Sequence, residues 1–204
     1  MAGCCDSGCS LDGLRERQRG TLRAVLGINA VMFVVIVMAA LYGKSTSLLA
    51  DSLDNLGDAL TYALSLYAVS RGGTTKAKVA LFKGGLIFLA AAVVAAQIVY
   101  KLVVPATPDY EIMGVFSLIG LAANSVCLFL LWRHRHEDVN MSSVWECSRN
   151  DIASNLSVFI AAGAVWLAGS GWPDMVVATG LVVLLLRSSF RVIASARAEL
   201  RAAG

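Results

Sequence analysis

Three aspartates lie on one face of a long apolar stretch of this chain. Asp51, Asp54 and Asp58 occur within SLLADSLDNLGDALTYALSLYAV, at spacings of three, four and seven residues. These spacings place the three side chains on the same face of a helix. An ionised carboxylate in hydrocarbon is costly, so such groups face a protein interior or a watery cavity and pair with a cation. The stripe therefore indicates a path for a metal ion or a proton.

A second pair of metal-ligating residue types, Cys147 and Asp151, lies four residues apart in WECSRNDIASNLSVFIAAGAV. Two helices that each present two donors at this spacing can surround one ion with four donors, the number that zinc prefers. A thiolate would favour softer ions such as cadmium, whereas an all-oxygen site would suit manganese. The predicted metal ligands are Asp54, Asp58, Cys147 and Asp151, with Asp51 and Asn155 as accessory donors.

The elements that must position these residues are predicted to be membrane-spanning helices. Of the 204 residues, 57% are hydrophobic and 15% are charged, whereas about 25% of a soluble domain is charged. Only three prolines and few polar runs favour helices over a β-barrel. Six apolar stretches meet or approach the ~20 residues that a spanning helix needs. They cover residues 22–42, 47–70, 79–104, 110–132, 147–168 and 173–194.

Basic residues set the predicted orientation. Fifteen of the 17 lysines and arginines lie in or beside the two termini and the loops 70–83 and 133–149, and only Lys44 and Lys101 lie near the alternate loops. The positive-inside rule therefore places both termini in the cytoplasm. Lys83 is expected to snorkel to the cytoplasmic surface. We accordingly expect no basic residue at the depth of the aspartates and no structural ion pair there.

The predicted fold class is an all-α integral membrane protein with six transmembrane helices and cytoplasmic termini. The predicted divisions are a flexible tail (1–20) with Cys4, Cys5 and Cys9, a six-helix transmembrane domain (21–195) and a short cytoplasmic tail (196–204). The net charge of +3 follows from the topology and requires no nucleic-acid partner.

These motifs resemble those of the cation diffusion facilitators, a family of proton-coupled metal exporters. STSLLADSLDNLGDA resembles the family's entry to the second helix, and CSRNDIASNLSVFIAA resembles its fifth-helix motif. Counting from Ser45, the resemblance places the family's metal pair on Asp54 and Asp58 and a frequent extra acid on Asp51. It covers most of residues 22–194.

In the fifth-helix motif, Asp151 takes the aspartate place and Cys147 the place usually held by histidine. Asp174, in WPDMVVATGL, resembles an acid common at the start of the sixth helix. The resemblance is to a short form without the family's cytoplasmic C-terminal domain. It implies a metal/proton antiporter in the cell (inner or plasma) membrane, a homodimer in the lipid bilayer that exports Zn²⁺ and also Cd²⁺ or Co²⁺, with no permanently bound cofactor.

Two other classes stay open on the residues alone. A membrane-embedded aspartyl enzyme would use two aspartates on separate helices as a dyad that shares a proton, although three acids on one helix exceed what a dyad needs. A non-transporting accessory subunit is the second alternative. The chain shows no Walker A pattern, so we expect a secondary active transporter and not an ATP-driven pump or an enzyme.

The depth of the two acidic pairs imposes a geometric condition. Asp54 lies ~9 residues, or ~14 Å, from the outer end of its helix, and Asp151 lies ~18 residues, or ~27 Å, from the outer end of its own. Straight helices of equal length would hold the two pairs apart. We therefore expect a tilted helix, or a fifth helix that ends before Ala168, to bring them together.

Overall fold

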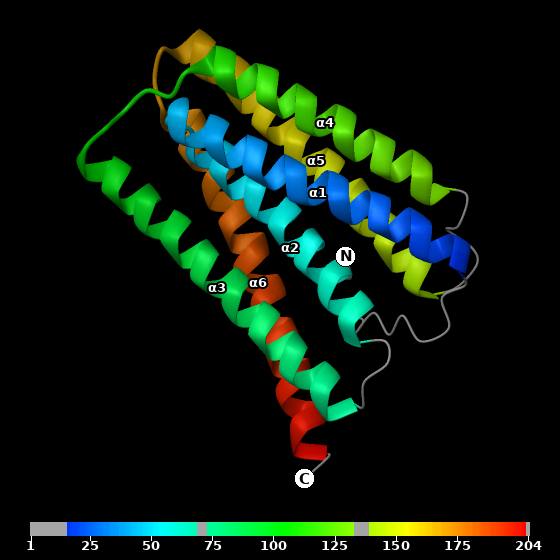
Figure 1. The fold of residues 1–204 in the computed structure, drawn as a ribbon. Coiled ribbons are helices and arrows are strands. Elements are labelled where there is room, and N and C mark those ends of the chain that lie inside the picture. Colours follow the sequence, from blue (N-terminus) through cyan, green and yellow to red (C-terminus); the bar gives the residue numbers. More distant parts are fainter. Residues whose placement is uncertain (1–15, 69–72, 133–138, 203–204) are drawn as a thin grey trace.

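The computed structural model describes residues 16–68, 73–132 and 139–202 (Figure 1). Within these ranges the chain forms six α-helices and no strand. At residues 139–148 only the backbone is described. The helices are α1 (Glu16–Tyr42), α2 (Thr46–Ala68), α3 (Gly73–Val103), α4 (Tyr110–Trp132), α5 (Val139–Ala168) and α6 (Trp172–Ala202).

Each apolar stretch of the sequence corresponds to one helix. We call the end with the three short connections, residues 43–45, 104–109 and 169–171, the outer end, and the opposite end the inner end. At the outer end the helices begin or end within a residue or so of the apolar stretches. At the inner end α1, α3, α5 and α6 continue by six to eight residues, because backbone hydrogen bonding does not stop where the hydrocarbon ends.

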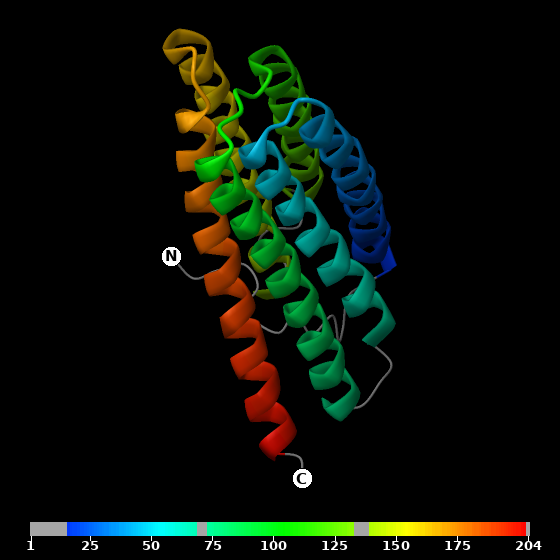
Figure 2. The same cartoon turned by 90° about the vertical axis from the view of Figure 1, so that its left-hand side faces the viewer.

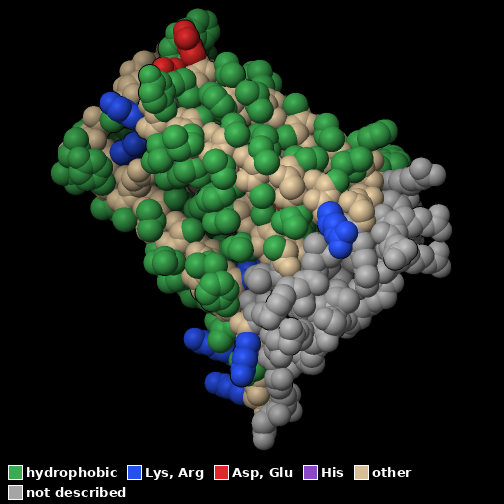
Figure 3. Space-filling model, viewed as in Figure 1, with side chains coloured by type: hydrophobic (Ala, Val, Ile, Leu, Met, Phe, Trp, Pro, Cys, Tyr) green, Lys and Arg blue, Asp and Glu red, His purple; other side chains and the backbone are tan. Residues whose placement is uncertain are grey.

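The helices are suited to a membrane. Five of them are long and apolar enough to cross one: α1, α3, α4, α5 and α6. The remaining helix, α2, has 23 residues and carries the three aspartates. Hydrophobic side chains cover much of the described face in Figure 3, and lysines and arginines gather toward its ends. The all-helical membrane fold is therefore confirmed, whereas the crossing of α2 and the side on which the termini lie stay predictions.

Helix α2 lies between two groups of helices (Figures 1 and 2). On one side α3 packs along α6, and on the other α4 packs along α5, with α1 against α2 and α4. A buried apolar cluster joins the groups, with members from every helix such as Ile36, Leu48, Ile87, Met113, Val158 and Leu181. The pair α3–α6 diverges from α1, α4 and α5 toward the inner end (Figure 1).

Asp174 of α6 fastens the outer end of α2. Its fully buried carboxylate accepts hydrogen bonds from the backbone N–H groups of Thr46 and Ser47, both at 2.9 Å. The hydroxyls of Ser45 and Ser47 donate to it at 2.8 and 2.7 Å. The first turn of a helix has unpaired N–H donors and a partial positive charge, so an acid from another helix is stabilised there.

A lysine from α3 completes this outer junction. Lys101 Nζ lies 3.3 Å from Asp174 Oδ2 and donates a hydrogen bond to the carbonyl oxygen of Lys44 at 2.6 Å. Lys44 itself has a positive φ of 52°, which turns the chain from α1 into α2. In the same region the N–H of Asp109 donates to the carbonyl of Gly43 at 2.9 Å. The outer ends of α1, α2, α3 and α6 are thereby held together.

Replacing Asp174 by alanine should destabilise the fold strongly. The change would leave the Lys101 ammonium and the donors of Ser45, Thr46 and Ser47 without their buried acceptor. Loss of one partner from a buried charged network typically costs about 3–5 kcal/mol. Denaturant unfolding of the full chain in detergent micelles measures this loss. Glu111→Ala, at an exposed acid in the first turn of α4, should leave stability nearly unchanged. Equal stability of both variants would contradict the assigned role of Asp174.

Candidate functional site

The acidic face of α2 points into the protein. Asp51 is fully buried, Asp58 is 7% exposed and Asp54 is partly buried. Asn55, on the neighbouring face, is also buried, and its amide donates to the carbonyl of Asp51 at 3.3 Å. The stripe therefore lies in the middle of the bundle, where water is scarce and each carboxylate needs a proton, a hydrogen-bond donor or a cation.

Two of the aspartates meet α5. Ser154 Oγ donates a hydrogen bond to Asp54 Oδ2 at 3.2 Å. The carboxyl groups of Asp58 and Asp151 lie close enough to interact. The structure thus places Asp54 and Asp58 at the contact between α2 and α5, where Ser154 contacts Asp54 and Asp151 adjoins Asp58.

The expected mismatch in depth does not keep the two acidic segments apart. Helix α5 extends to Ala168, so early termination is not the solution. Ser154 contacts Asp54, and Asp151 adjoins Asp58. The segment of α5 from Ser154 to its outer end is longer than the segment of α2 from Asp54 to its own outer end, so the two outer ends need not be level.

A basic residue lies beside the acidic pair, contrary to our expectation. Lys83 of α3 is 6% exposed, and its Nζ donates a hydrogen bond to Thr61 Oγ1. Its charge also attracts the carboxylate of Asp58. The expected snorkelling of Lys83 is wrong, because the ammonium finds an oxygen acceptor and a carboxylate inside the protein and does not need to reach the surface.

Two further side chains, which the sequence analysis did not identify as partners, lie near Asp58 and Asp151. Tyr62, one turn after Asp58, donates its hydroxyl to Asp58 Oδ2 at 3.2 Å. Cys127 of α4 is fully buried and close enough to Asp58 and Asp151 for electrostatic interaction. The four-residue spacing to Tyr62 was a visible signal, whereas the approach of Cys127 depends on how α4 packs.

The two accessory residues have oxygen atoms that are not satisfied. Neither carboxylate oxygen of the buried Asp51 has a hydrogen-bond partner among the described residues. Asn155 uses its amide nitrogen to donate to the carbonyl of Asp151 at 2.8 Å, and its Oδ1 is likewise unpartnered there. Such buried oxygens are suited to a cation, a proton or a water molecule.

The complete four-donor arrangement is not present in the described part of the chain. No three His, Cys, Asp or Glu side chains within it lie close enough together to hold one ion. The side chain of Cys147 lies outside the described residues, as do Cys4, Cys5 and Cys9. The backbone places Cys147 one turn from Asp151, toward the inner end of α5.

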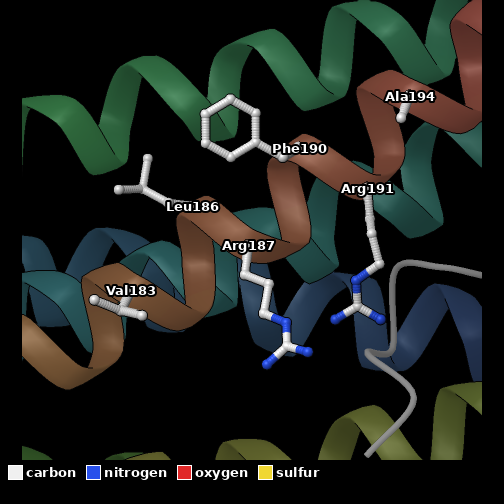
Figure 4. Close-up of a pocket in the computed structure, with 6 residues that line it drawn as sticks. All are labelled: Val183, Leu186, Arg187, Phe190, Arg191 and Ala194. Carbon is white, nitrogen blue, oxygen red and sulfur yellow. The ribbon is translucent and has the colours of Figure 1, made fainter.

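A separate surface cavity of ≈ 670 Å³ runs along α6. Its lining is apolar except for two arginines, and consists of Val183, Leu186, Arg187, Phe190, Arg191 and Ala194. Figure 4 shows Arg187 and Arg191 on one side of α6 and Phe190 on the other, toward α3. Phe190 packs edge-on against Phe88 with ring centroids 5.4 Å apart. This lining contains none of the predicted metal ligands.

Comparison with known proteins gives two results. The model of the cation efflux transmembrane domain matches residues 22–201. An uncharacterized transporter from Synechocystis sp. is 27% identical over 175 residues, which are 78% of this chain and 56% of that protein. The chain therefore spans little more than half the length of this relative.

The packing of α4 on α5 predicts a specific effect at Gly120. A Cβ atom there would collide with Asn155 Oδ1, whereas a Cβ at Gly114 would only touch Ala162 at 4.0 Å. Gly120→Ala should therefore lower the free energy of unfolding by about 1–3 kcal/mol, as overpacking does. Gly114→Ala is the matched control and should not lower it. Thermal unfolding in micelles tests this, and a stable Gly120→Ala variant would show that α4 does not approach Asn155 so closely.

Proposed function

The chain belongs to the cation efflux family, and on this premise we propose that it exports a divalent metal ion in exchange for protons. Zn²⁺ is the first candidate, with Cd²⁺ and Co²⁺ as further substrates. The observation that carries the proposal is the meeting of Asp58 of α2 with Asp151 of α5, beside Asp54. We further propose a homodimer in the cell membrane as the working form.

The proposed binding site is formed by Asp54, Asp58, Asp151 and Cys147. In the structure Asp54 accepts a hydrogen bond from Ser154, and Asp58 accepts one from Tyr62. These hydroxyl donors keep the carboxylates solvated without water. A dication would draw the carboxylates away from the hydroxyls and toward one another, because its charge offers each of them a stronger partner. Asp51 of α2 and Asn155 of α5 would supply further oxygens.

Proton exchange follows from the chemistry of the donors. Asp58 and Asp151 lie close enough to share one proton, and the carboxylate of Asp51, which has no partner among the described residues, offers a second place for one. Carboxylates and thiolates must be deprotonated to bind metal, so binding releases protons. If the site opens first to one side and then to the other, metal and protons travel in opposite directions.

The two alternatives, an aspartyl enzyme and a non-transporting accessory subunit, are not equally supported. An Asp58–Asp151 pair that shares a proton is also the chemistry of an aspartyl dyad. Family membership and the resemblance to a transporter nevertheless indicate a transporter and not an enzyme. A non-transporting accessory subunit would keep the same fold, so transport by the chain itself must be measured.

Uptake of Zn²⁺ into everted membrane vesicles tests the proposed function. Vesicles that contain the full chain and are acidic inside should accumulate Zn²⁺, and an ionophore that collapses the pH gradient should stop it. Asp58→Asn and Asp151→Asn should each reduce uptake to the level of vesicles without the protein, because each removes a charged ligand. Glu111→Gln, at an exposed position on α4, is the control and should transport normally.

Uptake by the wild type no greater than that of vesicles without the protein would favour the accessory subunit, and an unchanged rate in Asp58→Asn would remove Asp58 from the site. Uptake that persists after collapse of the pH gradient would leave the transporter in place but would remove proton coupling.

Cadmium selectivity tests the thiol ligand. If Cys147 binds the ion, Cys147→Ser should reduce Cd²⁺ uptake about tenfold more than Zn²⁺ uptake, because sulfur favours the softer ion. Competition between the two metals in the same vesicle assay measures the ratio. Cys127→Ser is the companion variant, since Cys127 also lies near Asp58 and Asp151. A change in selectivity that follows Cys127 and not Cys147 would transfer the ligand role to α4.

A further inference from the structure

Lys83 is a buried lysine set against the acidic face of α2. Its side chain is 6% exposed and donates from Nζ to Thr61 Oγ1. Thr61 lies one turn after Asp58, whose carboxylate the same ammonium attracts. Lysine is almost never fully buried unless it is paired. Asp58 and Thr61 together provide that pairing.

The packing of α2 on α3 fixes Lys83 at this level. A Cβ atom at Gly57 would lie 3.6 Å from Ile87 Cδ1. Gly57 precedes Thr61 by four residues on α2, and Ile87 follows Lys83 by four residues on α3. Two contacts one turn apart on antiparallel helices define a single register. The packing of the helices therefore fixes the level of Lys83 on α3, and its hydrogen bond to Thr61 places the ammonium within one turn of Asp58 along α2.

Helix α6 supports the same turn of α3 from the other side. Ser189 Oγ donates to the carbonyl of Gly84 at 2.8 Å. A Cβ at Gly84 would lie 2.7 Å from Ile193 Cγ1, so the backbones approach closely there. The pair α3–α6 thus presents Lys83 to α2 as one packed unit.

We propose that the Lys83 ammonium is an internal cation that neutralises Asp58 when no metal is bound and that an incoming divalent ion must displace. The inference rests on the proposed function, because it takes Asp58 as a metal ligand. Two cations at one carboxylate repel each other strongly in a low-dielectric interior. The flexible four-carbon stem of lysine allows the ammonium to withdraw. Lys83 therefore weakens metal binding, and its return to Asp58 assists release of the ion.

The groups that face Asp58 support this assignment. Tyr62 of α2 donates a hydroxyl, Asp151 of α5 contributes a carboxyl group, and Cys127 of α4 lies nearby. Among these described neighbours Lys83 is the one that brings a full positive charge. The cationic neighbour of Asp58 therefore comes from α3 and its acidic neighbour from α5.

A purely structural role would give different behaviour. If Lys83 only ties α3 to α2, removal of either end of its hydrogen bond should weaken the protein in the same way. Thr61→Val removes the hydroxyl acceptor but keeps the charge. Lys83→Gln removes the charge but keeps an N–H donor for Thr61, and Lys83→Met removes both. The charge and the hydrogen bond can thus be separated.

The test is equilibrium binding of Zn²⁺ and Co²⁺ to the purified full chain in detergent at one fixed pH. Lys83→Met and Lys83→Gln should each bind at least about tenfold more tightly than the wild type, because a repelling charge is gone. Lys83→Arg and Thr61→Val, which keep the charge, should stay within about threefold of the wild type. Lys78→Met, at an exposed lysine of α3, controls for a general change in charge.

The outcomes separate this inference from the proposed function. If the wild type binds and transports metal but neither neutral variant binds more tightly than Lys78→Met, only the role of Lys83 is lost. Weaker binding by Lys83→Gln would also overturn it and would leave Lys83 as a structural tie. If the wild type neither binds nor transports metal, the proposed function fails, and the internal cation fails with it.

Discussion

The structure depends on how each carboxylate inside the bundle is compensated. Asp174 accepts five hydrogen-bonding contacts from Ser45, Thr46, Ser47 and Lys101, and such complete satisfaction makes a buried charge a fixed structural element. Asp58 lies near the carboxyl group of Asp151, a tyrosine hydroxyl and a lysine. Asp51 has no partner among the described residues. The carboxylate at the outer end of α2 thus has all of its hydrogen-bonding capacity used, whereas the carboxylates in the middle of the helix do not.

This gradient explains why α2 is suited to carry the site. Its outer end is held by α6 and α3 through Asp174 and Lys101. Its middle contacts α5 at Ser154 and Asp151 and α3 at Lys83. Helix α2 is consequently linked to both groups of helices, at its outer end and in its middle. The divergence of α3–α6 from α1, α4 and α5 toward the inner end (Figure 1) is a further feature of the same arrangement.

The sequence predicted what depends on local pattern and on solvent. Helical spacing placed Asp51, Asp54 and Asp58 on one face, and apolarity located the outer ends of the helices, where turns such as 43–45 are short. The partners of those acids depend on helix crossing, which single-chain periodicity does not encode. Ser154 could be suspected because it lies one turn from Asp151. Lys83 could not, because its depth alone suggested a route to the surface, and only the register of α3 on α2 turns it toward Asp58.

The polarity of α2 also bears on how such a chain enters a bilayer. An aspartate at the centre of a helix opposes insertion by the translocon by about 2.5–3.5 kcal/mol. Helix α2 has three aspartates and is not among the five helices that are long and apolar enough to cross a membrane. In a six-span topology α2 would therefore need a neighbouring helix that inserts together with it. Helix α1 can fill this role, because a tight turn at Gly43 and Lys44 joins it to α2 and the two helices pack along each other. Helices α1 and α2 would then insert together as a helical hairpin, and insertion of the apolar α1 would offset the cost of inserting the acidic α2.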